Sequence, residues 1–80
     1  MDYKKYILES TGKAIRRHRT TMRLTLLDLE EATGISKGDL SLIERGKKNV
    51  EFTTIVRIAF SLGIQVSDLY RITFPEEKAK

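Results

Sequence analysis

The residues best suited to chemistry follow one another at helical spacing near the middle of the chain. Lys37, Ser41 and Arg45 are four residues apart, so a helix would place them on one face. Gly38 and Leu42 lie beside them. Amines and hydroxyls at this spacing can hydrogen-bond to base edges in a DNA groove, but the same residues also suit an ordinary solvated helix face. The face alone does not decide between these two interpretations.

Two short helices joined by a tight turn, over 25–33 and 36–45, are expected to position this face. Each helix begins with a hydroxyl residue that is followed three positions later by an acid, as in a capping box. A glycine follows each helix, where a left-handed residue is favoured. A helix–turn–helix of this kind can place its second helix in a DNA groove. The capping pairs are Thr25 with Asp28 and Ser36 with Asp39, and the glycines are Gly34 and Gly46.

The composition leaves few other classes of protein open. The 80 residues include no cysteine and one histidine, so we expect no disulfide, no metal site and no catalytic nucleophile–base pair. Without a glycine-rich phosphate loop there is no reason to expect an enzyme or a cofactor. No apolar run approaches the roughly 18 residues of a membrane span, and the first residues do not form a signal peptide. We therefore expect one small cytoplasmic domain that does not contact a membrane.

The net charge of +4 is distributed unevenly. Residues 1–24 hold seven Lys or Arg and two acids, residues 25–35 hold three acids and no base, and residues 36–48 hold four bases and two acids. Alternating basic and acidic segments in one small domain indicate patches rather than an even coat of charge. Cations on either side of the second helix are what a helix–turn–helix protein needs along a phosphate backbone.

The rest of the chain predicts an all-α, compact bundle of four to five helices. Residues 1–74 should form one domain and residues 75–80 a disordered charged tail, with Ser67 capping the last helix. The further helices are expected over about 2–22, 52–62 and 67–71. The residues placed on inward faces are Leu8, Thr11, Ile15, His18 and Met22, then Leu26, Leu27 and Leu29, then Leu40 and Ile43, and finally Phe52, Ile55, Ile58, Ala59 and Leu62.

Together these residues resemble the lambda-repressor/Cro family of helix–turn–helix proteins, also called the XRE family. The match covers roughly residues 8–70, and its most specific part is a Gly-Ile-Ser turn followed at the family's spacing by Ile-Glu-x-Gly. The resemblance implies a regulator, bacterial or phage-encoded, that binds double-stranded DNA as a homodimer on a pseudo-palindromic operator. Restriction–modification controllers and phage repressors are the nearest types. The matching positions are Gly12, Ile15, Arg16, Arg19, Leu24, Thr25, Leu29, 33–36, Leu40, Ser41, 43–46, Asn49, Ile58, Ala59, Leu62 and Gly63.

The resemblance also implies roles for individual residues. Arg19 and Glu44 match a pair that forms a buried salt bridge between the first and third helices of the family. The positions implied to face base edges are Lys37, Gly38, Ser41 and Leu42, and those implied to lie near phosphates are Thr25, Arg45, Lys47 and Lys48.

The four base-facing residues offer little direct readout. Lys37 can donate to guanine, Ser41 can donate or accept, and Leu42 can pack on a thymine methyl. Gly38 offers only close approach of the backbone. We therefore expect DNA shape and phosphate contacts to carry an unusually large share of the specificity.

Two positions depart from the family pattern. Leu26 replaces a glutamine that normally contacts phosphate or base, and Glu30 replaces a small residue that lets the second and third helices pack closely. A carboxylate at position 30 must turn to solvent or find a partner. Together with Leu42, these residues favour an alternative function, a protein-interaction module on a helix–turn–helix scaffold with weak or no specific DNA binding.

A homodimer needs an apolar surface outside the core. Apolar residues that follow the last helix would otherwise be exposed, so we expect the dimer interface there. These residues are Leu69, Tyr70, Ile72 and Phe74.

Overall fold

The computed structural model describes residues 2–72 and 74. This part of the chain consists of four α-helices and one 3-10 turn, with no strand among those residues. The prediction of an all-α bundle is therefore confirmed. The elements are α1 (Tyr3–Thr21), α2 (Leu26–Thr33), α3 (Lys37–Glu44), α4 (Phe52–Leu62) and η1 (Val66–Leu69).

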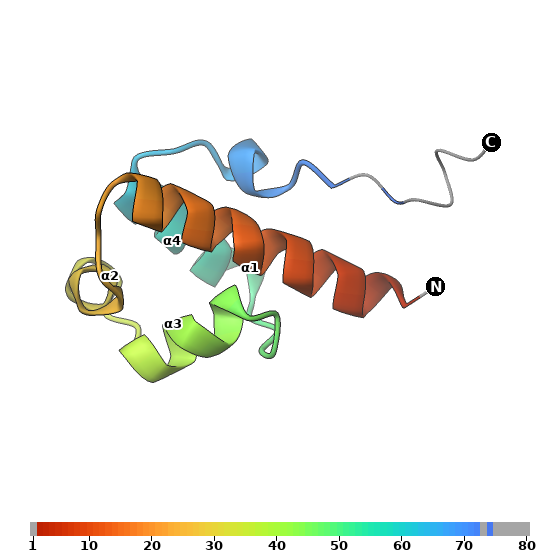
Figure 1. Cartoon of the computed structure of the whole chain (residues 1–80), viewed down its shortest axis with the longest axis horizontal. Coiled ribbons are helices and arrows are strands. Elements are labelled where there is room, and N and C mark those ends of the chain that lie inside the picture. The colour runs from red at the N-terminus through yellow and green to blue at the C-terminus, as the bar shows by residue number, and fades with distance from the viewer. Residues whose placement is uncertain (1, 73, 75–80) are drawn as a thin grey trace.

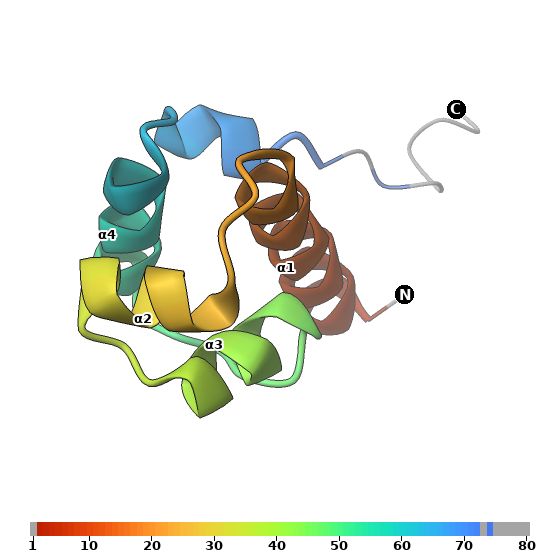
Figure 2. The same ribbon diagram turned by 60° about the vertical axis from the view of Figure 1, so that its left-hand side comes forward.

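The long helix α1 is the element on which the others are assembled. α3, α4 and η1 all pack against α1, while α2 packs against α3 and α4. Figure 1 shows α2 and α3 on one side of α1 and η1 on the other, and Figure 2 shows α1 and α4 facing each other while α2 and α3 close one end. α3 is thus an outer helix that rests on α1 and α2.

One buried cluster of apolar side chains holds the elements together. Every element contributes to it, so the eight-residue helices α2 and α3 gain from packing the stability that such short helices lack alone. The most deeply buried side chains are Ile15 of α1, Leu29 of α2, Leu40 of α3, Ile58 and Leu62 of α4 and Leu69 of η1.

Gly12 allows α1 to approach the C-terminal end of α3. A Cβ atom at this position would collide with the carbonyl oxygens of Ile43 and Glu44. The close approach therefore requires the absence of a side chain, and it fixes α3 against the middle of α1.

Three residues expected on inward faces are exposed, which corrects the sequence prediction. Met22 is 47% exposed because it caps α1 after the last helical turn. Leu27 is 50% exposed because α2 buries Leu29 and turns its opposite side to solvent. Phe52 is 61% exposed at the first position of α4, where its ring lies 6.2 Å from that of Tyr70 instead of entering the core.

The last helix also differs from its prediction. Instead of a helix over 67–71 capped by Ser67, the chain forms the 3-10 turn η1, which begins at Val66 after Gln65. The Asp68 carboxylate accepts a hydrogen bond from the Gln65 N–H at 3.0 Å, and this bond sets the earlier start. The predicted tail over 75–80 lies outside the described residues. None of the helices in the described part has the length and apolar character needed to cross a membrane.

Candidate nucleic-acid interface

Helix α3 buries one side and turns the other outward. Leu40, Ile43 and Glu44 are its buried residues, and they face the bundle. The outward side carries the residues expected to face base edges. Of these, Lys37 and Gly38 are exposed, and Ser41 and Leu42 are half-buried.

The start of α2 is closed by a complete capping box. The Thr25 hydroxyl accepts from the Asp28 N–H at 3.0 Å, and the Asp28 carboxylate accepts from the Thr25 N–H at 2.8 Å. These hydrogen bonds to Thr25 lower the pKa of Asp28. Because its hydroxyl is the cap acceptor, Thr25 has a structural role at the position where phosphate contact was expected.

The start of α3 is capped differently. Ser36 Oγ accepts from the Asp39 N–H at 3.2 Å, as predicted, but the Asp39 side chain does not complete a capping box. Its Oδ1 forms an ion pair with Lys48 instead, at 3.0 Å from Lys48 Nζ. The first N–H of α3, that of Lys37, is bound by the Glu30 carboxylate at 2.7 Å. The spacing of residues along the sequence did not reveal either of these contacts.

The end of α3 is anchored by the Arg19–Glu44 ion pair. Arg19 Nε lies 2.7 Å from Glu44 Oε2, and Arg19 Nη2 lies 3.0 Å from Glu44 Oε1, so the contact is bidentate. Arg19 Nη1 also donates to the Leu24 carbonyl at 2.7 Å. Hydrogen bonding to Glu44 raises the pKa of Arg19. The pair joins α1 to α3 and keeps the Arg19 charge away from any partner surface.

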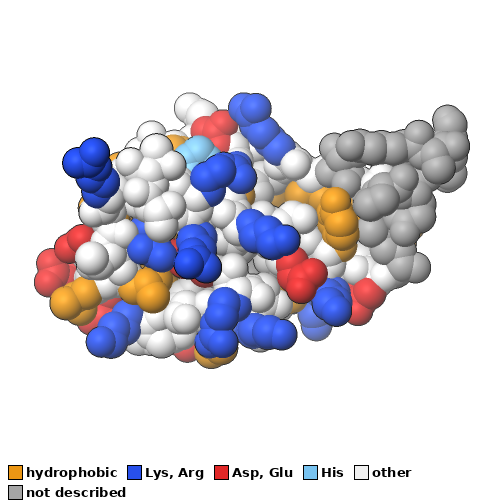
Figure 3. All heavy atoms as spheres, in the orientation of Figure 1, with side chains coloured by type: hydrophobic (Ala, Val, Ile, Leu, Met, Phe, Trp, Pro, Cys, Tyr) orange, Lys and Arg blue, Asp and Glu red, His pale blue; other side chains and the backbone are white. Residues whose placement is uncertain are grey.

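The remaining cationic side chains near α3 differ in whether an acidic side chain already pairs with them. Arg45 and Lys47 are exposed, and Arg45 makes one long contact of 3.4 Å to the Ser41 carbonyl. Lys48 is held by Asp39, so it would have to leave that carboxylate to meet a phosphate. Figure 3 shows Lys and Arg side chains spread over the face that α1 and α3 present, with acidic and apolar side chains both at the α2 end and toward the N-terminal end of α1.

The residues expected at a dimer interface fall into two groups. Leu69 is 1% exposed and belongs to the core, so its assignment to an interface is wrong. Tyr70, Ile72 and Phe74 are half-buried, and burial raises the pKa of the Tyr70 hydroxyl. The Phe74 ring lies 5.1 Å from the Tyr3 ring.

A second apolar surface was missed in the sequence. Phe52, Val56 and Phe60 are exposed along one face of α4, and Phe60 is 84% exposed. Their spacing of four residues is the signal that could have revealed them. Because Phe52 lies beside Tyr70, this stripe is continuous with the C-terminal apolar residues. We call Phe52, Val56 and Phe60 the α4 stripe.

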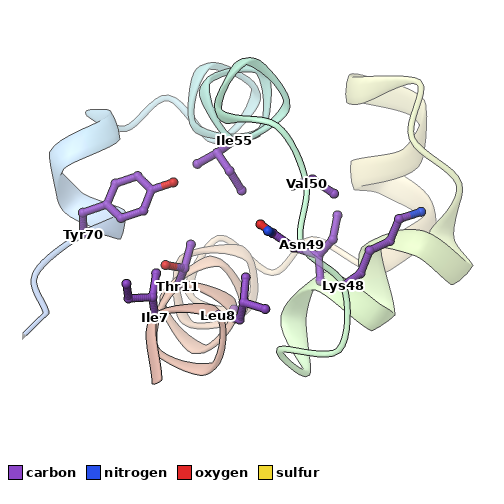
Figure 4. A pocket seen from close by; sticks show the side chains of 10 residues that line it. Ile7, Leu8, Thr11, Lys48, Asn49, Val50, Ile55 and Tyr70 are labelled. Atoms are coloured by element: carbon purple, nitrogen blue, oxygen red, sulfur yellow. The ribbon is translucent and has the colours of Figure 1, made fainter. Parts of the chain in front are cut away.

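A small cavity lies between α1 and α4 (Figure 4). It has a volume of about 70 Å³ and is bounded by α1, α4, Tyr70 and the loop after α3. Figure 4 shows the polar ends of Tyr70 and Asn49 directed toward the space between α1 and α4. The hydroxyl of Thr11 is buried there without a hydrogen-bond partner in the described part of the molecule. Since an apolar cavity that binds benzene measures about 150 Å³, this one is too small for an aromatic ligand. Within the described part of the chain, no group of His, Asp or Glu could hold a metal ion.

Two short helices joined by a left-handed glycine, with the second resting on a long first helix, define a helix–turn–helix DNA-binding domain. Comparison with known families gives the same class, because residues 14–75 match the Cro/C1-type HTH DNA-binding domain. The chain therefore belongs to the XRE, or Cro/C1-type, family of helix–turn–helix DNA-binding domains.

Individual relatives are similar over most of this chain. The immunity repressor protein of Bacillus phage phi105 is 42% identical over 58 residues, which are 72% of this chain and 40% of that protein. An HTH-type transcriptional regulator of Mycobacterium bovis is 39% identical over 56 residues, which are 70% of this chain and 22% of that protein. The chain thus spans less than half the length of these relatives.

Solved structures with the same fold include two regulators. The restriction–modification controller protein C.AhdI of Aeromonas hydrophila superposes with a TM-score of 0.76 at 28% identity, covering 79% of this chain and 96% of that one. The clp gene regulator ClgR of Corynebacterium glutamicum superposes with a TM-score of 0.76 at 36% identity, covering 79% and 82%.

Proposed function

We propose that this protein is a sequence-specific DNA-binding regulator that acts as a homodimer on a pseudo-palindromic operator. The observation that carries the proposal is the fixation of α3 at both ends, by Glu30 at Lys37 and by Arg19 at Glu44. A helix held in this way presents Lys37, Gly38, Ser41 and Leu42 to the major groove in one orientation.

Phosphate contacts supply most of the affinity in this proposal. Arg45 and Lys47 are exposed at the end of α3 and can reach the backbone on one side of the groove. Lys48 joins them when it exchanges Asp39 for a phosphate. On the other side of the groove, a phosphate can approach the start of α2 at Thr25. Since the base-facing residues are few, DNA shape contributes much of the discrimination.

The homodimer forms through apolar residues that the single chain leaves exposed. The α4 stripe and the half-buried Tyr70, Ile72 and Phe74 supply such a surface outside α3. An isologous contact through this surface gives two copies of α3 related by a twofold axis, as a palindromic operator requires. Such a regulator works in the cytoplasm, associated with the nucleoid when it is bound to DNA.

A protein-interaction module is the second candidate function. The α2 end of the molecule favours it, because Leu27 is 50% exposed and Leu26 and Leu42 are only half-buried. Acidic Glu30 and Glu31 lie on the same helix and would oppose a phosphate backbone. This surface could instead receive a partner protein, with weak or no specific binding to DNA.

Selection of bound duplexes from a random library at moderate salt tests the proposal. Enrichment of an inverted repeat with half-sites about 34 Å apart is the expected result. Sedimentation of the complex should give two chains for each duplex. The logarithm of the binding constant should fall with the logarithm of the salt concentration with a slope of about −0.9 for each phosphate contacted. If the folded protein selects no motif, and its affinity does not change with salt concentration, the proposal is overturned in favour of the protein-interaction module.

A further inference from the structure

Glu30 lies where α2 meets the start of α3. Its Oε1 accepts a hydrogen bond from the backbone N–H of Lys37 at 2.7 Å. Lys37 is the first residue of α3, so this N–H has no acceptor within its own helix. In residues 2–72 and 74, it is the one hydrogen bond that joins a side chain of α2 to α3. The bond ties the two helices at the end where the base-facing residues begin.

Among the described residues, none of the other hydrogen bonds of the turn joins α2 to α3, because Ser36 caps only the start of α3 and the Thr33 carbonyl accepts from a side chain of α4. Gly34 has a φ of 77° and donates to the Glu30 carbonyl at 2.8 Å. The Thr33 hydroxyl accepts from the Ile35 N–H at 3.1 Å. Apolar packing between the helices sets their separation, but it is non-directional. The bond from Glu30 to α3 adds a directional constraint on how α3 is turned about its own axis.

We propose that Glu30 is a positioning residue that sets the orientation of α3 and thereby the discrimination between DNA sequences. The inference rests on the proposed function as a DNA-binding regulator. Side chains that read bases must be held within about 0.5 Å of their productive geometry. Lys37 and Ser41 emerge from the part of α3 that Glu30 holds.

The charge of Glu30 has a second and opposite effect. A carboxylate at the positive end of a helix stabilises that helix, but it repels a phosphate that approaches the same end. Glu30 therefore lowers the affinity for DNA in general while it sharpens the choice between sequences. These two effects can be separated, because the hydrogen bond and the charge can be removed one at a time.

Three variants make this separation. Glu30→Gln retains an oxygen acceptor and removes the charge, and Glu30→Ala removes both. Glu31→Gln is the matched control, because Glu31 is the exposed neighbour on α2 and its replacement removes the same charge. The measurement is the dissociation constant of each protein for the selected duplex and for a duplex with one substituted base pair in each half-site.

Both glutamine variants should bind the two duplexes about two- to fivefold more tightly, since one repulsive charge is lost in each. Their ratio of affinities for the two duplexes should stay within about twofold of the wild-type ratio, because the bond from residue 30 to α3 is kept or untouched. Glu30→Ala should lower that ratio about tenfold, which is the discrimination that one well-placed base contact provides. A ratio that Glu30→Ala leaves unchanged overturns the proposal.

A measurement on the free protein keeps this test separate from the proposed function. The amide hydrogen of Lys37 should exchange with solvent more slowly in the wild type and in Glu30→Gln than in Glu30→Ala. Equal exchange in all three proteins overturns the tie between α2 and α3, whether or not DNA is bound. Slow exchange in a wild-type protein that selects no duplex overturns the proposed function, and with it the role of Glu30 in discrimination.

Discussion

Removing one partner of the Arg19–Glu44 pair should destabilise the fold strongly. The two side chains are 11% and 5% exposed, and two hydrogen bonds of 2.7 and 3.0 Å join them. A third bond joins Arg19 to the Leu24 carbonyl. In Glu44→Ala the guanidinium would keep only that third bond while remaining largely shielded from water. The site would therefore hold a charge without a counter-ion.

The expected loss is a large part of the total stability. Truncating one partner of a buried ion pair costs about 3–5 kcal/mol, because the remaining charge is left unpaired. The whole free energy of unfolding of an 80-residue domain is about 4–12 kcal/mol. Replacing both residues by apolar ones, as in Arg19→Met with Glu44→Leu, should cost less than the sum of the single changes, since no charge remains buried.

Urea unfolding at one fixed protein concentration measures this prediction. Wild type, Arg19→Met, Glu44→Leu and the double variant form a cycle, and we expect a coupling energy of about 2 kcal/mol or more. Arg16→Met is the control, because Arg16 is exposed on α1 and its replacement should change stability by about 0.5 kcal/mol or less. Additive single losses, or losses no larger than that of the control, would refute the reasoning that this pair anchors α3 to α1.

Three further predictions concern packing, pH and assembly. Gly12→Ala should destabilise the fold by about 3 kcal/mol or more because a Cβ would meet backbone oxygens, whereas Gly38→Ala, in open space on α3, should stabilise it by about 0.5–1 kcal/mol; thermal unfolding of both variants checks the contrast. Because hydrogen bonds from Thr25 lower the pKa of Asp28 in the folded state, their contribution is present above the unfolded pKa of about 3.9 and lost as the pH falls through the folded value. The difference in melting temperature between wild type and Asp28→Ala should therefore shrink as the pH is lowered from 5 to 2.5. A difference that stays constant over this range would contradict the prediction. Phe60→Glu should weaken a homodimer at least about tenfold without loss of helix content, since it places a charge on an exposed face of α4; an unchanged sedimentation coefficient would exclude that face.

Much of the fold could be predicted from the sequence because the informative signals are local. Helix capping by Thr25 and Ser36 depends on neighbours within a few residues, and so does the left-handed conformation of Gly34. The spacing of residues along the sequence therefore reveals these features. The faces of Leu27 and Phe52 were predicted wrongly because burial depends on which neighbouring element covers a helix, and spacing within one helix does not tell that.

The candidate site was less predictable than the fold for the same reason. The partner of Glu30 is seven residues away across a turn, and the partner of Asp39 lies on the loop beyond α3. A departure from the family pattern showed that Glu30 needed an explanation, but not what it would bind. Leu69 shows the opposite error, since a residue that looks exposed at the end of a chain can complete the core.

These long-range contacts explain how so short a helix can be held in one orientation, as the proposed reading of DNA requires. An isolated helix of eight residues is unstable in water, so α3 has the orientation that its neighbours impose. Glu30 holds its first residue, Leu40 anchors its middle in the core, and Arg19 holds its last residue through Glu44. All three contacts use the buried side or the backbone of α3, so they leave its outward side chains free to vary. The operator preferred by such a domain could therefore change through substitutions at Lys37 or Ser41 with little loss of stability. Substitutions at the three anchors would change both the stability and the preferred operator.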